Sequence, residues 1–119
     1  MHMTIDELQD LVTEFSQQRD WERFHTPKNL VMALTGEVGE LAELFQWLTP
    51  EQSQELCDNE QGRVKVEHEI ADVLMYLLRL ATVLDIDLAT AVKSKLQVNE
   101  QRYPVELARG RAEKYSELG

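Results

Sequence analysis

The sequence predicts an all-α protein, a four-helix bundle whose core is completed by oligomerisation. Glycine and proline are scarce, with five and three in 119 residues, and no stretch shows the alternation of a strand beside a hairpin turn. Residues 63–84 are apolar on more than one side, which is typical of a helix that is buried all round. Four helices supply few partners for it, so we expect a second subunit to cover it. The length indicates one domain, residues 1–119.

Capping signals mark where the predicted helices begin. Thr4 and Glu7 form the pattern of a capping box, and Thr26 before Pro27 is typical of an N-cap with proline at the first helical position. Asp87 is expected to cap the last long helix, which ends before a proline. The expected elements are helices at about 4–18, 26–47, 49–56, 63–84 and 87–102, a loop at 21–25, a polar linker at 57–62 and a less ordered tail at about 104–119. The residues expected to be buried on the second helix are Leu30, Leu34, Val38, Leu41, Phe45 and Leu48.

Charge and cysteine content exclude several classes of protein. The chain carries 22 acidic and 12 basic residues, a net charge of −10, which does not suit binding to a nucleic-acid backbone. A nucleotide held through metal ions is compatible with this charge. Cys57 is the only cysteine, so no intrachain disulfide forms, and a reducing, cytoplasmic location is expected. No apolar run reaches the roughly 18 residues of a membrane span, and no secretory signal is recognised, so we expect no membrane partner.

Two pairs of carboxylates carry the main functional signal. The first pair is Glu37 and Glu40, and the second is Glu69 and Asp72. Each pair has the i,i+3 spacing that places two side chains about 5–6 Å apart on one helix face. Asp72 stands in an apolar stretch with no Lys or Arg close in sequence, so its charge is costly unless a counter-ion neutralises it. Oxygen ligands suit Mg²⁺ and Mn²⁺, so the pattern predicts a catalytic metal site that acts on a phosphate.

The same residues have other interpretations. Acidic side chains on helices are most often solvated, which for the first pair is an equal alternative. A di-iron carboxylate bundle would use two Glu-x-x-His motifs, and the one present, Glu22 to His25, precedes a proline in a loop. His68 begins a pattern that resembles a zinc-binding His-Glu-x-x-His, but its last position is an aspartate. An all-carboxylate site therefore favours Mg²⁺ or Mn²⁺.

Aromatic and polar residues elsewhere are candidates for substrate binding. Aromatic rings can sandwich a nucleobase, and stacking contributes about 1–3 kcal/mol per base, although any one ring is as readily a core residue. Tyr76 lies one helical turn after Asp72, and Trp47 lies two helical turns after Glu40. Both are therefore expected to border the carboxylates. A lysine and an asparagine at i,i+4 fit a phosphate contact or a solvated face. The candidates are Trp21, Phe24, His25, Trp47, Tyr76, Lys95 and Asn99.

In combination these motifs resemble a known family. The motifs in chain order are Phe24-His25-x-Pro27, Glu37-x-x-Glu40, Phe45-Gln46-Trp47 and Glu69-x-x-Asp72. They are similar to those of the all-α nucleoside triphosphate pyrophosphohydrolases, the MazG-like superfamily, and most similar to its dCTP pyrophosphatase branch. The resemblance covers nearly the whole chain, through Lys95 to Arg102-Tyr103-Pro104, and implies a MazG-like bundle.

The resemblance implies an activity and a role for each candidate. Family members hydrolyse a nucleoside triphosphate between its α- and β-phosphates, giving a monophosphate and pyrophosphate, and assemble as dimers or as dimers of dimers. The four carboxylates would bind Mg²⁺, and Lys95 and Asn99 would contact phosphates. The residues implied at the base and sugar are Trp21, His25, Trp47 and Tyr76. The expected function is Mg²⁺-dependent hydrolysis of dCTP or a related deoxynucleotide, which cleans the nucleotide pool.

Two positions distinguish this chain within the superfamily. Gly36 stands where many members have a second glutamate, a feature it shares with the dCTP pyrophosphatase branch. Val12 stands where that branch has a histidine that approaches the substrate, and a lost polar contact can relax discrimination between bases. Two alternatives stay open: the same chemistry on dUTP or a purine nucleotide, and a helical interaction module without catalytic activity.

Overall fold

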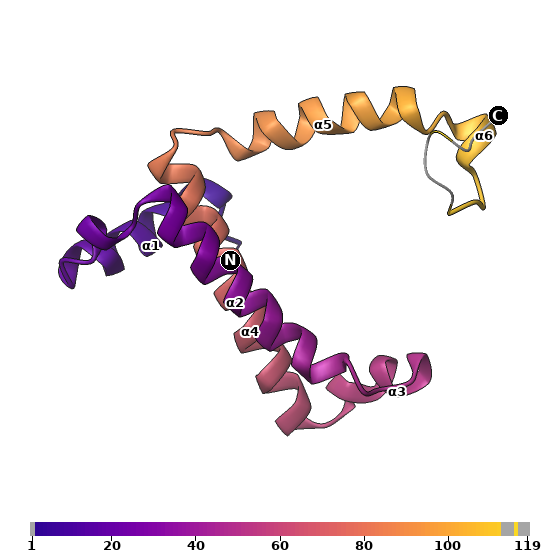
Figure 1. Cartoon of the computed structure of the whole chain (residues 1–119), viewed down its shortest axis with the longest axis horizontal. Helices are drawn as coiled ribbons and strands as arrows, with labels where there is room; N and C mark the ends of the chain where they lie inside the picture. Colours follow the sequence, from indigo (N-terminus) through magenta and orange to yellow (C-terminus); the bar gives the residue numbers. More distant parts are fainter. Residues whose placement is uncertain (1, 113–115, 117–119) are drawn as a thin grey trace. The chain divides into compact units, whose positions relative to one another are not determined.

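The computed structural model describes residues 2–112 and 116, and within these residues it contains helices and no strands (Figure 1). The all-α class predicted from the sequence is confirmed. The chain divides into two compact parts, Met1–Asp85 and Ile86–Gly119. A single domain over 1–119 stays a prediction. The elements, with η for a 3₁₀-helix, are α1 (Ile5–Gln18), η1 (Glu22–Phe24), α2 (Pro27–Phe45), α3 (Pro50–Glu55), η2 (Leu56–Asp58), α4 (Glu60–Val83), α5 (Leu88–Arg102) and α6 (Val105–Ala108).

The predicted capping signals begin the first three α-helices. The Thr4 hydroxyl accepts a hydrogen bond from the backbone N–H of Glu7, and the Glu7 carboxylate accepts one from the backbone N–H of Thr4, each at 3.1 Å. Thr26 accepts from the N–H of Asn29 at 3.2 Å with Pro27 at the first helical position of α2. A second capping box, at Thr49, opens α3. Each cap satisfies N–H groups that have no partner inside the helix.

The polar linker expected at 57–62 is instead η2 and the first turn of α4. Asn59 begins α4 earlier than predicted, because its side-chain oxygen accepts from the N–H of Gly62 at 2.8 Å. A Cβ at position 62 would collide with the backbone oxygen of Leu56, so only glycine lets η2 fold back against this turn. The sequence pattern predicted that this helix begins at about residue 63, and the structure begins it at Glu60. The side-chain cap of Asn59 accounts for the difference.

The C-terminal part contains the helices α5 and α6. Asp87 occupies the predicted N-cap position of α5, but its carboxylate accepts from the Thr90 hydroxyl at 2.8 Å and makes no capping bond to the backbone. The tail predicted to be less ordered contains the one-turn helix α6 after Pro104. Residues 113–115 and 117–119 of that tail lie outside the described residues.

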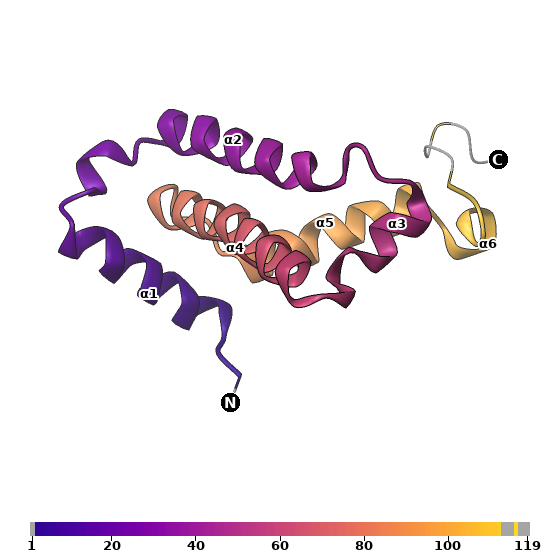
Figure 2. The same cartoon turned by 90° about the horizontal axis from the view of Figure 1, so that it is seen from below.

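The N-terminal part is built around α2 and α4, which lie side by side and antiparallel, with α1 against α4 (Figures 1 and 2). Gln9 fastens α1 to α4 by donating to the backbone oxygen of Leu78 at 3.4 Å and to the Thr82 hydroxyl at 3.1 Å. The buried apolar residues are Leu30 from α2 and Val66, Leu78 and Ala81 from α4. Among the described residues, no helix is both long and apolar enough to cross a membrane.

Several apolar residues that we expected to be buried are exposed in the single chain. Val38 on α2 is 47% exposed, which contradicts its predicted burial. On α4, Ile70, Leu74 and Leu77 are 52%, 38% and 41% exposed, and their i, i+4, i+7 spacing makes one apolar stripe along the helix. Within this chain, α1 and α2 pack on some faces of α4 and bury them. The apolar stripe lies on a face of α4 that stays exposed.

Candidate active site

Four carboxylates converge between α2 and α4. Glu37 and Glu40 come from α2, and Glu69 and Asp72 come from α4. One oxygen atom from each residue lies within 4.8 Å of the others. The i,i+3 spacing places each pair on one helix face, and the antiparallel packing of the two helices turns the faces toward each other. The structure therefore brings together all four residues that the sequence proposed as a metal site.

The cluster is electrostatically unfavourable without a cation. Burial raises the pKa of Glu37 to about 7 from its ordinary 4.5, and the neighbouring carboxylate of Glu40 adds to the shift. Desolvation also raises the pKa of Glu69, again with a contribution from Glu40. One oxygen of each, Oε2 of Glu37 and Oε2 of Glu69, is buried without a hydrogen-bond partner. Buried acceptors without partners are costly, so these two oxygens are placed to bind a proton or a metal ion.

The donor set fits a hard divalent cation. All four donors are carboxylate oxygens, which are the ligands that Mg²⁺ and Mn²⁺ prefer, and the cluster contains no histidine or cysteine that would favour zinc. The orphaned oxygens of Glu37 and Glu69 supply acceptors that no protein donor uses. The cluster can therefore hold a divalent metal ion.

A cavity of about 260 Å³ opens beside the carboxylates. Glu37 and Asp72 belong to both the cluster and the cavity wall, so a molecule in the cavity would lie next to the carboxylate cluster. The rest of the wall comes from α1, the η1 segment and α4. The remaining lining residues are Val12, Phe15, Ser16, Trp21, His25, Met75, Tyr76 and Arg79.

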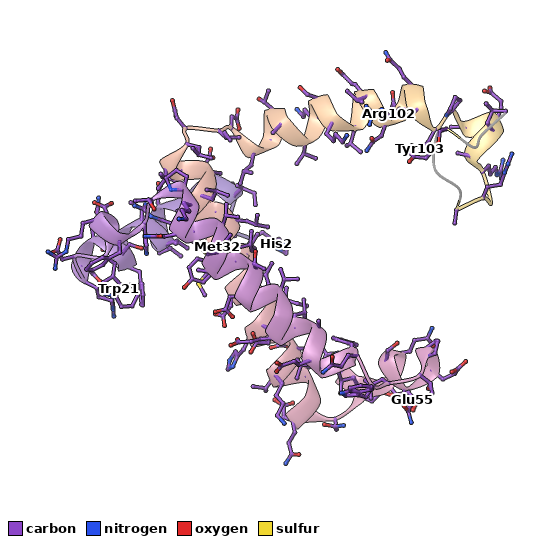
Figure 3. All side chains as sticks on the ribbon, in the orientation of Figure 1. His2, Trp21, Met32, Glu55, Arg102 and Tyr103 are labelled. Atoms are coloured by element: carbon purple, nitrogen blue, oxygen red, sulfur yellow. The ribbon has the colours of Figure 1, made fainter. Side chains whose placement is uncertain are left out.

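The mouth of the cavity has an aromatic side. Trp21 lies at the turn between α1 and α2 (Figure 3), and its ring meets that of Phe15 edge-on with centroids 5.7 Å apart. The Arg19 guanidinium covers Phe15 at 3.6 Å from the ring centroid. Trp21 is 43% exposed, so part of its ring stays available to a flat ligand.

Comparison with known proteins places these features in a family. A family model described as MazG-like matches residues 33–118, which include all four carboxylates. The chain belongs to the MazG-like family. It is 48% identical over 115 residues to dCTP pyrophosphatase 1 of Rattus norvegicus and 47% identical to that of Homo sapiens, in each case covering 97% of this chain and 68% of the relative. A crystal structure of a pyrophosphatase from Archaeoglobus fulgidus matches with a TM-score of 0.78 and 44% identity over 87% of this chain and 95% of that one. The family and the fold class predicted from the sequence are therefore confirmed.

Of the aromatic candidates in this MazG-like chain, the structure brings Trp21, His25 and Tyr76 to the cavity and leaves two outside its lining. Phe24 is 54% exposed and lies under the Arg23 guanidinium. Trp47 is 86% exposed. Because α2 ends at Phe45, helical periodicity no longer relates position 47 to Glu40, and the expected role of Trp47 beside the carboxylates stays a prediction.

Lys95 and Asn99 lie on α5, in the C-terminal part of the MazG-like chain. Lys95 is exposed and Asn99 is half-buried. The backbone oxygen of Asn99 accepts from the N–H of Tyr103 at 2.7 Å, which closes the last turn of the helix. Their contact with phosphates stays a prediction.

Sequence reasoning missed Arg79, although α4 carries it to the same cavity as Asp72. It lies two helical turns beyond Asp72 and is only 6% exposed. The i,i+7 spacing was visible in the sequence, but the residues that bind the guanidinium come from α1 and η1, and no local pattern relates them. Phe15 and Ser16 were missed as lining residues for the same reason, because they reach the cavity only through the packing of α1 on α4, whereas the i,i+3 spacing of Met75 from Asp72 could have indicated it.

Proposed function

We propose that this protein is a dCTP pyrophosphatase that hydrolyses dCTP between the α- and β-phosphates to dCMP and pyrophosphate and so cleans the nucleotide pool. The observation that carries the proposal is the convergence of four carboxylates at the edge of a cavity with an aromatic wall. Relatives named dCTP pyrophosphatase 1, at 48% and 47% identity over nearly the whole chain, support this substrate and agree with the enzyme class predicted from the sequence. A cytoplasmic location stays a prediction.

Glu37, Glu40, Glu69 and Asp72 would hold Mg²⁺, with Mn²⁺ as a substitute. When bound, such an ion would neutralise charge on the phosphate oxygens and would lower the pKa of a water molecule, the chemistry that hydrolysis at phosphorus needs. Because Glu37 and Asp72 border the cavity, an ion that they hold would lie beside the phosphate end of a nucleotide in the cavity. Lys95 and Asn99 are proposed to contact the phosphates.

Trp21 is proposed to stack on the base. Replacing it with alanine should therefore reduce kcat/KM for dCTP by about 5- to 150-fold. This factor corresponds to the roughly 1–3 kcal/mol that one stacked base contributes. The matched control is Met32→Ala, a truncation of an exposed apolar side chain on α2 outside the cavity lining. We expect Met32→Ala to change kcat/KM by less than about twofold, since surface changes away from a site have small effects. Equal losses in the two variants would contradict the assigned base pocket.

We also propose that the enzyme is a homodimer or a dimer of dimers. The exposed stripe formed by Ile70, Leu74 and Leu77 on α4 supports this, because monomeric proteins rarely leave contiguous apolar patches uncovered. Light scattering should give a solution mass of at least twice the chain mass of 13.8 kDa. Leu77→Lys should reduce that mass, whereas Gln61→Lys, at an exposed polar position of the same helix, should not. A monomeric mass for the unmodified protein would overturn this part of the proposal.

The substrate is tested by incubating the protein with Mg²⁺ and each canonical deoxynucleoside and ribonucleoside triphosphate, together with 5-methyl-dCTP, and separating the products. We expect dCTP or 5-methyl-dCTP to be hydrolysed to its monophosphate and pyrophosphate. Its kcat/KM should be higher than that for purine nucleotides or dUTP. A preference for dUTP or a purine nucleotide would keep the chemistry and replace the substrate.

A further inference from the structure

Arg79 is the one described residue of the cavity wall that is both permanently charged and almost fully buried. Its guanidinium donates three hydrogen bonds: Nε to Nδ1 of His25 at 3.0 Å, Nη1 to the Thr13 hydroxyl at 3.3 Å and Nη2 to Oε1 of Glu22 at 3.4 Å. The carboxylate of Glu22 is its ion-pair partner. Arg79 thus connects α1 and η1 to α4 at the cavity. Its hydrogen bond to His25 also determines the tautomer of that imidazole ring.

The contact with Arg79 determines which nitrogen of His25 carries a proton. An arginine side chain stays protonated in proteins and is only a donor, so Nδ1 of His25 must accept with a free lone pair. A neutral imidazole has one N–H, which therefore lies on Nε2. Burial lowers the pKa of His25, the Arg79 charge lowers it further, and Glu22 opposes them, which keeps the ring neutral near pH 7. His25 is consequently a donor at Nε2 and not an acceptor.

We infer that Arg79 is a positioning residue for base selection, which holds His25 as a fixed Nε2–H donor in the wall of the base cavity. This inference rests on the proposed function. Cytosine presents an acceptor at N3 beside its O2 acceptor, whereas uracil presents an N–H donor at N3. A histidine that is free to change tautomer pairs with either base. A histidine fixed as a donor and facing N3 of the base pairs with cytosine and opposes the N–H of uracil, so a pocket with this contact prefers dCTP to dUTP.

The first test uses Arg79→Met, which keeps an unbranched side chain of similar length and removes the donor to His25. Without that donor His25 can take either tautomer, so the ratio of kcat/KM for dCTP to that for dUTP should fall by about tenfold, the equivalent of one hydrogen bond. The matched control is Thr13→Val, which removes another partner of the same guanidinium and leaves the bond to His25 in place. Its ratio should stay within about twofold of the unmodified protein.

A loss of rate that is equal for the two nucleotides in Arg79→Met, or an equal fall of the ratio in Thr13→Val, would overturn the inference, because either result means that Arg79 acts only on the packing of the wall. An unmodified protein that hydrolyses neither nucleotide would instead overturn the proposed function.

The second test needs no variant that might fail to fold and no turnover. A long-range ¹H–¹⁵N correlation spectrum of the unmodified protein reports the tautomer of each of its three histidines, and the His25 signals are assigned by their absence from His25→Asn. We expect the Nε2–H tautomer alone at pH 7 to 8. An Nδ1–H tautomer, a mixture of tautomers or an imidazolium would overturn the inference, whatever the nucleotide selectivity.

Discussion

Replacing Glu40 with glutamine should abolish dCTP hydrolysis and leave the fold intact. Glutamine keeps the size of the side chain and removes the negative charge that holds the metal ion. Glu40 is the most exposed of the four carboxylates, so the change should not disturb the packing of α2 on α4. Metal-assisted hydrolysis gains several kcal/mol from the ion, and each 1.36 kcal/mol is a factor of ten, so kcat should fall by at least about 10³-fold.

Glu43→Gln is the matched control for this prediction. Glu43 lies on the same helix, one turn beyond Glu40, is exposed and does not belong to the carboxylate cluster. The control should keep its rate to within about twofold, as is usual for surface changes. Circular dichroism of both variants checks that the helices are intact. Activity that survives Glu40→Gln, or that is lost equally in the two variants, would contradict the assigned metal site.

Glu37→Gln should make the metal-free protein more stable at pH 8 and should give no such benefit at pH 5. The pKa of Glu37 is about 7 in the folded protein against an ordinary 4.5, so between these values the folded state binds more protons than the unfolded state. Its contribution to the free energy of unfolding is then lost as the pH rises toward 7 and above. Glutamine carries no charge at any pH and escapes this loss.

Thermal unfolding in EDTA from pH 5 to 8 tests this second prediction by the difference in Tm between Glu37→Gln and the unmodified protein. Taking the difference cancels the opposing contribution of His25, whose lowered pKa removes stability as the pH falls below 6.5. We expect an advantage of a few degrees at pH 8, because 1 kcal/mol moves Tm by roughly 2–8 °C in domains of this size range.

Added Mg²⁺ should reverse the order of the two proteins at pH 8. An ion that binds only the folded state stabilises it, and the unmodified protein keeps four carboxylate ligands whereas Glu37→Gln keeps three. A Tm difference that does not depend on pH in EDTA, or that Mg²⁺ leaves unchanged, would show that Glu37 does not carry the charge repulsion of the cluster.

Local rules were sufficient for most of the helices and for the carboxylate cluster. Thr4, Thr26 and Thr49 begin their helices because each cap is formed within a few residues along the chain. The carboxylates were predictable because two i,i+3 pairs on adjacent antiparallel helices need only one packing event to meet. Local chemistry and the fold agree at these positions.

The cavity was less predictable because its wall combines segments that are distant in sequence. Arg79 binds Thr13, Glu22 and His25, whose positions depend on how α1 packs on α4. Trp47 was assigned by extending the period of α2 beyond Phe45, where the helix ends. The apolar composition of the stripe on α4 was evident in the sequence, and its burial by a second subunit stays a prediction.

The decisive experiment for the metal-dependent activity is the release of pyrophosphate from dCTP in the presence of Mg²⁺, repeated with EDTA. We expect equal amounts of dCMP and pyrophosphate with the metal and neither product with EDTA. Release of orthophosphate and dCDP would place the cleavage at the wrong bond. An absence of products from a protein that circular dichroism shows to be folded would contradict the enzyme and favour a helical interaction module.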